Sequence, residues 1–69
     1  MTDSGRLKDL IQRSGLKKTY IAEKLGISYQ GYLKKESGKS DFLATEIVTM
    51  KSLLSLTNRE VSEIFLSSK

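Results

Sequence analysis

The chain of 69 residues contains no cysteine, no histidine and no proline. Without cysteine, neither a disulfide framework nor a thiolate metal site can supplement the core. Without histidine, the chain lacks the commonest general base and the commonest metal ligand. It also has no glycine-rich phosphate cradle. We therefore predict a binding protein rather than an enzyme, with no metal site and no cofactor.

Long apolar runs are absent as well. Residues 1–5 (MTDSG) are polar and lack the apolar stretch of a signal peptide, and nothing approaches the roughly 18 apolar residues of a membrane span. We expect an intracellular protein with no membrane partner and no small-molecule substrate.

The charge is unevenly distributed. The chain carries a net charge of +4, and residues 17–40 hold six lysines against two glutamates, whereas the remainder holds six basic and six acidic residues. The whole excess lies in one central segment. Such a segment can bind nucleic acid, or it can be a lysine-rich face that only keeps the protein soluble.

Apolar spacing, glycines and cap residues predict five helices, over about residues 5–14, 18–25, 29–37, 43–54 and 58–66. Ser4 and Ser28 are the expected N-caps of the first and third helices, and Gly15, Gly26 and Gly38 are the expected stops of the first three.

The last two helices begin differently. Ser40, Asp41 and Thr45 are alternative caps for the fourth helix, which is expected to carry Phe42. The fifth begins with a capping box, in which threonine at the N-cap is followed three residues later by Glu60.

Helices of two to three turns are not stable alone, so they must share one core. We predict a single all-α domain over residues 1–69, folded as a compact five-helix bundle. The expected core consists of Leu7, Leu10, Ile11, Leu16, Ile21, Ala22, Leu25, Ile27, Tyr32, Phe42, Ile47, Met50, Leu53, Leu56, Val61, Ile64 and Phe65.

Residues 21–28 (IAEKLGIS) hold the most informative motif. Ala22 allows close helix approach, and Gly26 supplies a left-handed residue that ends one helix and turns the chain. Ile27 fills the elbow and Ser28 starts the next helix. This arrangement predicts two short helices that cross steeply, with the second one projecting outward.

The motif resembles the helix-turn-helix of Cro and lambda-type repressors, the xenobiotic-response-element family. The resemblance covers about residues 7–65, and it continues through residues 27–30 (ISYQ), 37–39 (SGK), 41–47 (DFLATEI) and 56–61 (LTNREV). It implies a lambda-repressor-like DNA-binding bundle with the helix-turn-helix in the second and third helices. It is closest to small Cro-like regulators or modulators of repression from temperate phages, which act in the cytoplasm of the bacterial host cell.

The resemblance also implies a role for individual residues. The third helix would enter the major groove of operator DNA and read base edges, with Gln30 suited to adenine. The recognition helix would contribute Ser28, Tyr29, Gln30, Gly31, Leu33 and Lys34. Phosphate contacts would come from Lys17, Lys18, Thr19, Lys39 and Ser40.

Some features also fit another class of partner. Gly31 weakens the third helix, and Leu33 offers no hydrogen bond, so the same surface could bind a phage repressor protein with little or no DNA binding. The chain would then be an anti-repressor. Gln30 could also be a solvated helix residue, and Tyr32 fits the core better than the groove.

Two positions depart from the family's usual pattern. Glu36 stands where relatives usually place an apolar core residue, and Lys18 opens the second helix where the family often has a glutamine that braces the recognition helix. In single-domain relatives a homodimer usually forms through the C-terminal helices, which makes Leu54 and Leu66 candidate dimer contacts here.

Overall fold

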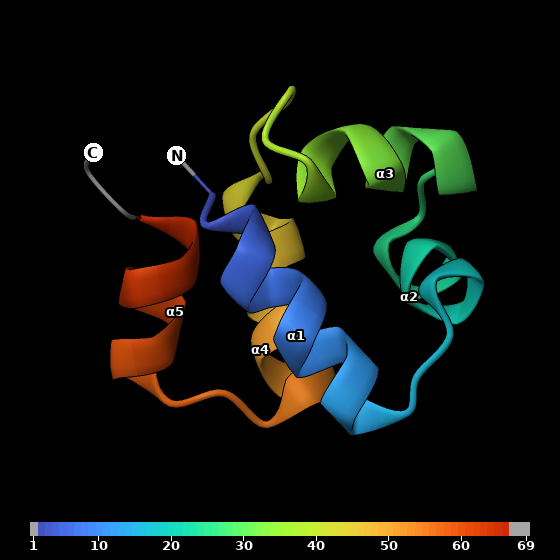
Figure 1. Cartoon of the computed structure of the whole chain (residues 1–69). Coiled ribbons are helices and arrows are strands. Elements are labelled where there is room, and N and C mark those ends of the chain that lie inside the picture. The colour runs from blue at the N-terminus through green and yellow to red at the C-terminus, as the bar shows by residue number, and fades with distance from the viewer. Residues whose placement is uncertain (1, 67–69) are drawn as a thin grey trace.

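The computed structural model describes residues 2–66, which form five α-helices and no strand (Figure 1). The helices are α1 (Ser4–Ser14), α2 (Lys18–Leu25), α3 (Tyr29–Glu36), α4 (Ala44–Leu54) and α5 (Asn58–Phe65). The all-helical prediction is confirmed, and every predicted boundary lies within one residue of the observed one.

The predicted glycine stops of α1 and α2 and two of the predicted N-caps are present, whereas α3 ends at Glu36 with Ser37, not Gly38, as its C-cap. Gly15 and Gly26 end α1 and α2 in the left-handed region, at φ 76° and 74°, where a side chain would be strained. The Ser28 hydroxyl accepts the Gly31 N–H at 3.0 Å. Thr57 and Glu60 form the predicted capping box at the start of α5.

The predicted N-cap of α1 was wrong. Asp3 caps the helix by accepting the Arg6 N–H at 3.2 Å, and Ser4 is already helical. The Asp3 N–H donates to the Ile64 carbonyl of α5 at 2.7 Å. This bond holds Asp3 in an extended conformation, so the helix begins at Ser4, one residue earlier than predicted.

The predicted start of α4 also needs correction. None of the three proposed cap residues caps this helix; Leu43 is the N-cap, and its N–H donates to the Glu46 carboxylate at 2.8 Å. Phe42 lies before the helix rather than on it, and its ring is buried.

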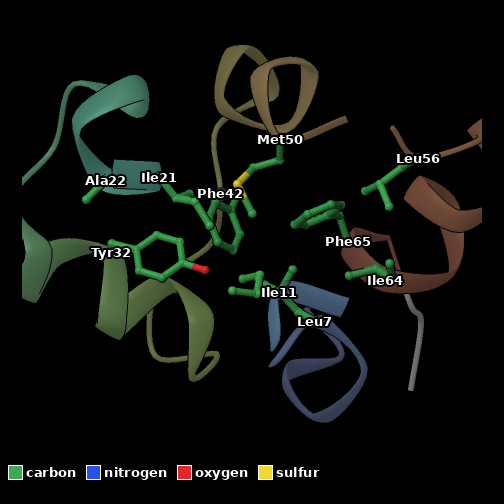
Figure 2. Close-up of a cluster of buried hydrophobic side chains, with 10 residues drawn as sticks. All are labelled: Leu7, Ile11, Ile21, Ala22, Tyr32, Phe42, Met50, Leu56, Ile64 and Phe65. Carbon is green, nitrogen blue, oxygen red and sulfur yellow. The ribbon is translucent and has the colours of Figure 1, made fainter. Parts of the chain in front are cut away.

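One core unites all five helices, as Figure 2 shows. Ten buried side chains form it: Leu7, Ile11, Ile21, Ala22, Tyr32, Phe42, Met50, Leu56, Ile64 and Phe65. All were predicted, and the other predicted core residues are partly buried against them. Phe42 is central to the cluster, because its ring makes edge contacts with Tyr32 at 6.2 Å and with Phe65 at 5.2 Å between centroids.

Two further observations concern residues 2–66 alone. None of their helices has the length and apolar character needed to cross a membrane. No group of three or more acidic side chains among them is placed to hold a metal ion.

Candidate functional site

The connection between α2 and α3 is short and tightly bonded. Gly26 donates to the Glu23 carbonyl at 3.0 Å, and Ile27 donates to the Ala22 carbonyl at 3.1 Å. The chain therefore turns immediately after α2, and Ser28 starts α3. Figure 1 shows α3 crossing α2 steeply along one edge of the bundle.

The outer face of α3 carries Tyr29, Gln30 and Lys34, which are all exposed. Gln30 and Lys34 are four residues apart and lie on the same side of the helix. Tyr32, on the inner side, is fully buried, as predicted. The three exposed side chains offer hydrogen-bond donors and acceptors to a second molecule.

Leu33 differs from the expectation that it faces the partner. Its side chain is half-buried and packs against the core. Its remaining surface lines a shallow pocket together with Lys34, Ser37 and Lys39. The apolar part of Leu33 therefore belongs mainly to the bundle.

Gly31 lies in the first turn of α3, where its N–H completes the Ser28 cap. A Cβ on Gly31 would lie 3.1 Å from the Ser28 hydroxyl oxygen, closer than an ordinary contact. A side chain at position 31 would therefore be in close contact with the cap, although Glu60 in α5 shows that a residue with a Cβ can donate to an N-cap hydroxyl in the same way.

The predicted phosphate contacts fall into two groups. Lys17, Thr19, Lys39 and Ser40 are exposed and available. Lys18 is already engaged in an ion pair, because its ammonium lies 3.0 Å from the Glu36 carboxylate. This pair places the first turn of α2 beside the last turn of α3.

The start of α2 retains unbonded amides. Lys17 is the N-cap, no side chain caps this end, and the first amide bonded into the helix is that of Ile21, which donates to the Lys17 carbonyl. No acidic residue lies in the first turn. Exposed N–H groups at a helix start favour an anion.

Ion pairs divide the surface into two parts. Arg6, Arg13 and Arg59 all pair with carboxylates on α1 or α5. By contrast, the four exposed lysines around α2 and α3 take part in no ion pair within residues 2–66; they are Lys17, Lys24, Lys34 and Lys39. Lys8 on α1 is also exposed and outside these pairs, so four of the five exposed lysines without an ion pair in residues 2–66 lie around α2 and α3.

Two buried carboxylates were not predicted. Glu36 is only 2% exposed and accepts hydrogen bonds from Lys18 Nζ and the Tyr32 hydroxyl, both at 3.0 Å. Burial and the adjacent carboxylate raise the pKa of Tyr32 far above its usual value, so its hydroxyl stays protonated and donates. The only sequence signal of this burial was the resemblance noted above, in which the position of Glu36 is usually occupied by an apolar core residue.

Glu46, the second buried carboxylate, joins α4 to α3. It accepts from Lys35 Nζ at 2.5 Å and from the Leu43 N–H. Burial alone would raise the pKa of Glu46, but these hydrogen bonds and the charge of Lys35 outweigh it and lower that pKa. Glu46 is thus a charged group that anchors the C-terminal half of α3.

Comparison of the chain with protein-family models, with curated proteins and with solved structures finds no match.

Proposed function

We propose that the chain is a DNA-binding transcriptional regulator in which α2, the turn at Gly26 and α3 form a helix-turn-helix. The outer face of α3 enters the major groove, which is wide enough to admit a helix. The observation that carries the proposal is the exposed polar face of α3 beside lysines that have no carboxylate partner in residues 2–66.

The side chains on that face suit base recognition. The carboxamide of Gln30 can both accept from and donate to the edge of adenine, and Lys34 can donate to the acceptors of guanine. Tyr29, which is 45% exposed, offers a hydroxyl and an apolar ring at the N-terminal end of the helix. These residues would discriminate between sequences.

Phosphate binding would come from the ends of the two helices. Lys17 and Thr19 flank the uncapped start of α2, and Lys39 and Ser40 follow α3. Such contacts fix the position of a protein on the duplex without reading sequence.

The biological setting follows from the resemblance to phage Cro-like regulators. In that setting the chain would act on a lysis–lysogeny switch, and a homodimer would bind a palindromic operator. Of the two candidate dimer contacts, Leu66 is exposed and Leu54 packs against the core.

Binding to a phage repressor without DNA is supported less well. That alternative depended on Gly31 and on a surface formed by Tyr29, Leu33 and Tyr32, but Tyr32 is buried, Leu33 packs mainly against the core, and only Tyr29 of the three is exposed. The exposed face of α3 therefore offers an apolar partner little beyond the ring of Tyr29.

The experiment is a selection of duplexes from a random DNA pool, followed by affinity measurements on the selected and a scrambled duplex. Gln30→Ala should abolish most of the preference, because losing one bidentate base contact costs about 1–3 kcal/mol. Gln12→Ala is the matched control, since Gln12 is also exposed but lies on α1. Sequence-independent binding by the wild type, combined with a stable complex with a co-encoded repressor, would overturn the proposal in favour of the anti-repressor.

A further inference from the structure

The inner side of α3 is unusually polar. Its two buried residues are Tyr32 and Glu36, and the carboxylate of Glu36 is among the least exposed groups of residues 2–66. Apolar burial is non-directional, so the packing of Tyr32 and Leu33 defines the angle of the helix less sharply than hydrogen bonds do. Charge-assisted hydrogen bonds are directional and strong, and they can define that angle.

Glu36 closes the unit formed by α2 and α3. The turn at Gly26 joins the end of α2 to the start of α3, and the Lys18–Glu36 pair joins the start of α2 to the end of α3 across 18 positions of sequence. The Lys18–Glu36 pair links the ends of α2 and α3 that lie far from the turn. It therefore adds to core packing and to the Lys35–Glu46 pair in fixing the angle at which α3 crosses α2.

Tyr32 orients the tie. Its hydroxyl donates to one oxygen of Glu36 while Lys18 donates to the other, and no buried side-chain polar atom of the described residues is left without a partner. The carboxylate is therefore satisfied on both oxygens in a single arrangement.

We infer that Glu36, held by Lys18 and Tyr32, is a positioning residue that sets the angle of α3 and thereby the sequence preference of the chain. It does so without touching DNA. The inference rests on the proposed function for its readout in DNA binding, but the angle itself is measurable without DNA.

The main test uses the double variant Lys18→Met/Glu36→Leu. Replacing a buried ion pair with apolar residues of similar size is often neutral or stabilising, so this variant is expected to fold. The double variant removes one positive and one negative charge, so the net charge of the protein is unchanged, and any remaining effect on phosphate binding is shared by the selected and scrambled duplexes. The ratio of the two affinities therefore isolates positioning. We expect that ratio to fall about tenfold, the equivalent of one lost base contact.

Two further variants make the test decisive. Tyr32→Phe removes only the hydroxyl, leaves every charge in place, and should lower the ratio about threefold, in line with the loss of a single hydrogen bond. Ile64→Val in α5 is the control for stability alone and should leave the ratio unchanged in the folded protein. If the double variant folds and keeps the affinity ratio of the wild type, the inference is overturned. If the double variant does not fold, a wild-type ratio in Tyr32→Phe overturns it.

Residual dipolar couplings of the backbone amides measure the angle between α2 and α3 directly. The double variant should show altered couplings in α3 relative to α2, and Ile64→Val should not. Unchanged couplings would refute the positioning role. If the wild type showed no sequence preference in DNA binding but the double variant still showed the expected change in couplings, only the proposed function would be refuted.

Discussion

The N–H of Gly31 donates to the Ser28 hydroxyl at 3.0 Å, and a Cβ on Gly31 would lie 3.1 Å from the same oxygen. A Cβ at position 31 would therefore be in tighter contact with the cap oxygen than an ordinary van der Waals contact. Helix propensity favours alanine over glycine by about 1 kcal/mol, and an N-cap serine contributes about the same amount.

This contact predicts non-additive substitutions. Ser28→Ala should cost about 1 kcal/mol, and Gly31→Ala should gain less than its helix propensity because the methyl group crowds the cap. In the Ser28→Ala background, Gly31→Ala should stabilise by about 1 kcal/mol. Urea unfolding of the four proteins measures the coupling. Gly5→Ala, whose Cβ would meet only an ordinary contact at 3.9 Å, is the control and should add independently to Ser28→Ala. Additivity at Gly31 would contradict the account.

The buried Glu46 should make the stability of the fold depend on pH in the acidic range. Its pKa is lowered in the folded protein, so its contribution is fully present above the unfolded value of about 4.3 and is lost as pH falls through the lower folded value. Glu46→Gln should cost about 1–3 kcal/mol at neutral pH and should remove part of the acid slope below about pH 5.

The control for Glu46 is Glu23→Gln, because Glu23 is exposed on α2 and joins no ion pair within residues 2–66. Unfolding free energies measured between pH 3 and pH 7 would decide. If both variants followed the wild-type profile, the buried Lys35–Glu46 pair would have no stabilising role.

Alanine substitutions at the adjacent residues Phe42 and Leu43 should differ sharply in their effect on stability. Phe42→Ala should destabilise the protein by about 3–5 kcal/mol, because the ring links Tyr32 to Phe65 in the only core of the described residues. Leu43→Ala should change stability by less than about 0.5 kcal/mol, because Leu43 is 62% exposed. Thermal unfolding compares the two, and equal losses would place the core elsewhere.

The free lysines predict the salt dependence of DNA binding. Of the four lysines assigned to DNA contact, Lys18 is paired with Glu36, which leaves Lys17, Lys34 and Lys39. Three cations give a slope of about −3 for log affinity against log salt, and each substitution by glutamine should make it shallower by about 0.9. Lys8→Gln on α1 is the control. An equal effect at Lys8 would show that the positive charge acts without a defined surface.

The sequence predicted the features that depend on neighbouring residues. Apolar spacing identified the five helices and the core, and Gly26 and Ser28 identified the turn between α2 and α3. The burial of Glu36 and Glu46 was not predicted, because their lysine partners lie 18 and 11 positions away in sequence. The pairing of Lys18 with Glu36 was missed for the same reason, because the sequence does not show which lysine the fold brings next to a carboxylate.

The most direct measurement is an NMR titration that follows each backbone amide as the selected duplex is added. We expect the largest shifts at residues 17–19, 28–34 and 39–40, with α1 and α5 little affected and a scrambled duplex giving smaller changes. Shifts concentrated on α1 and α5, or none at all along α3, would contradict the claim that α3 binds DNA.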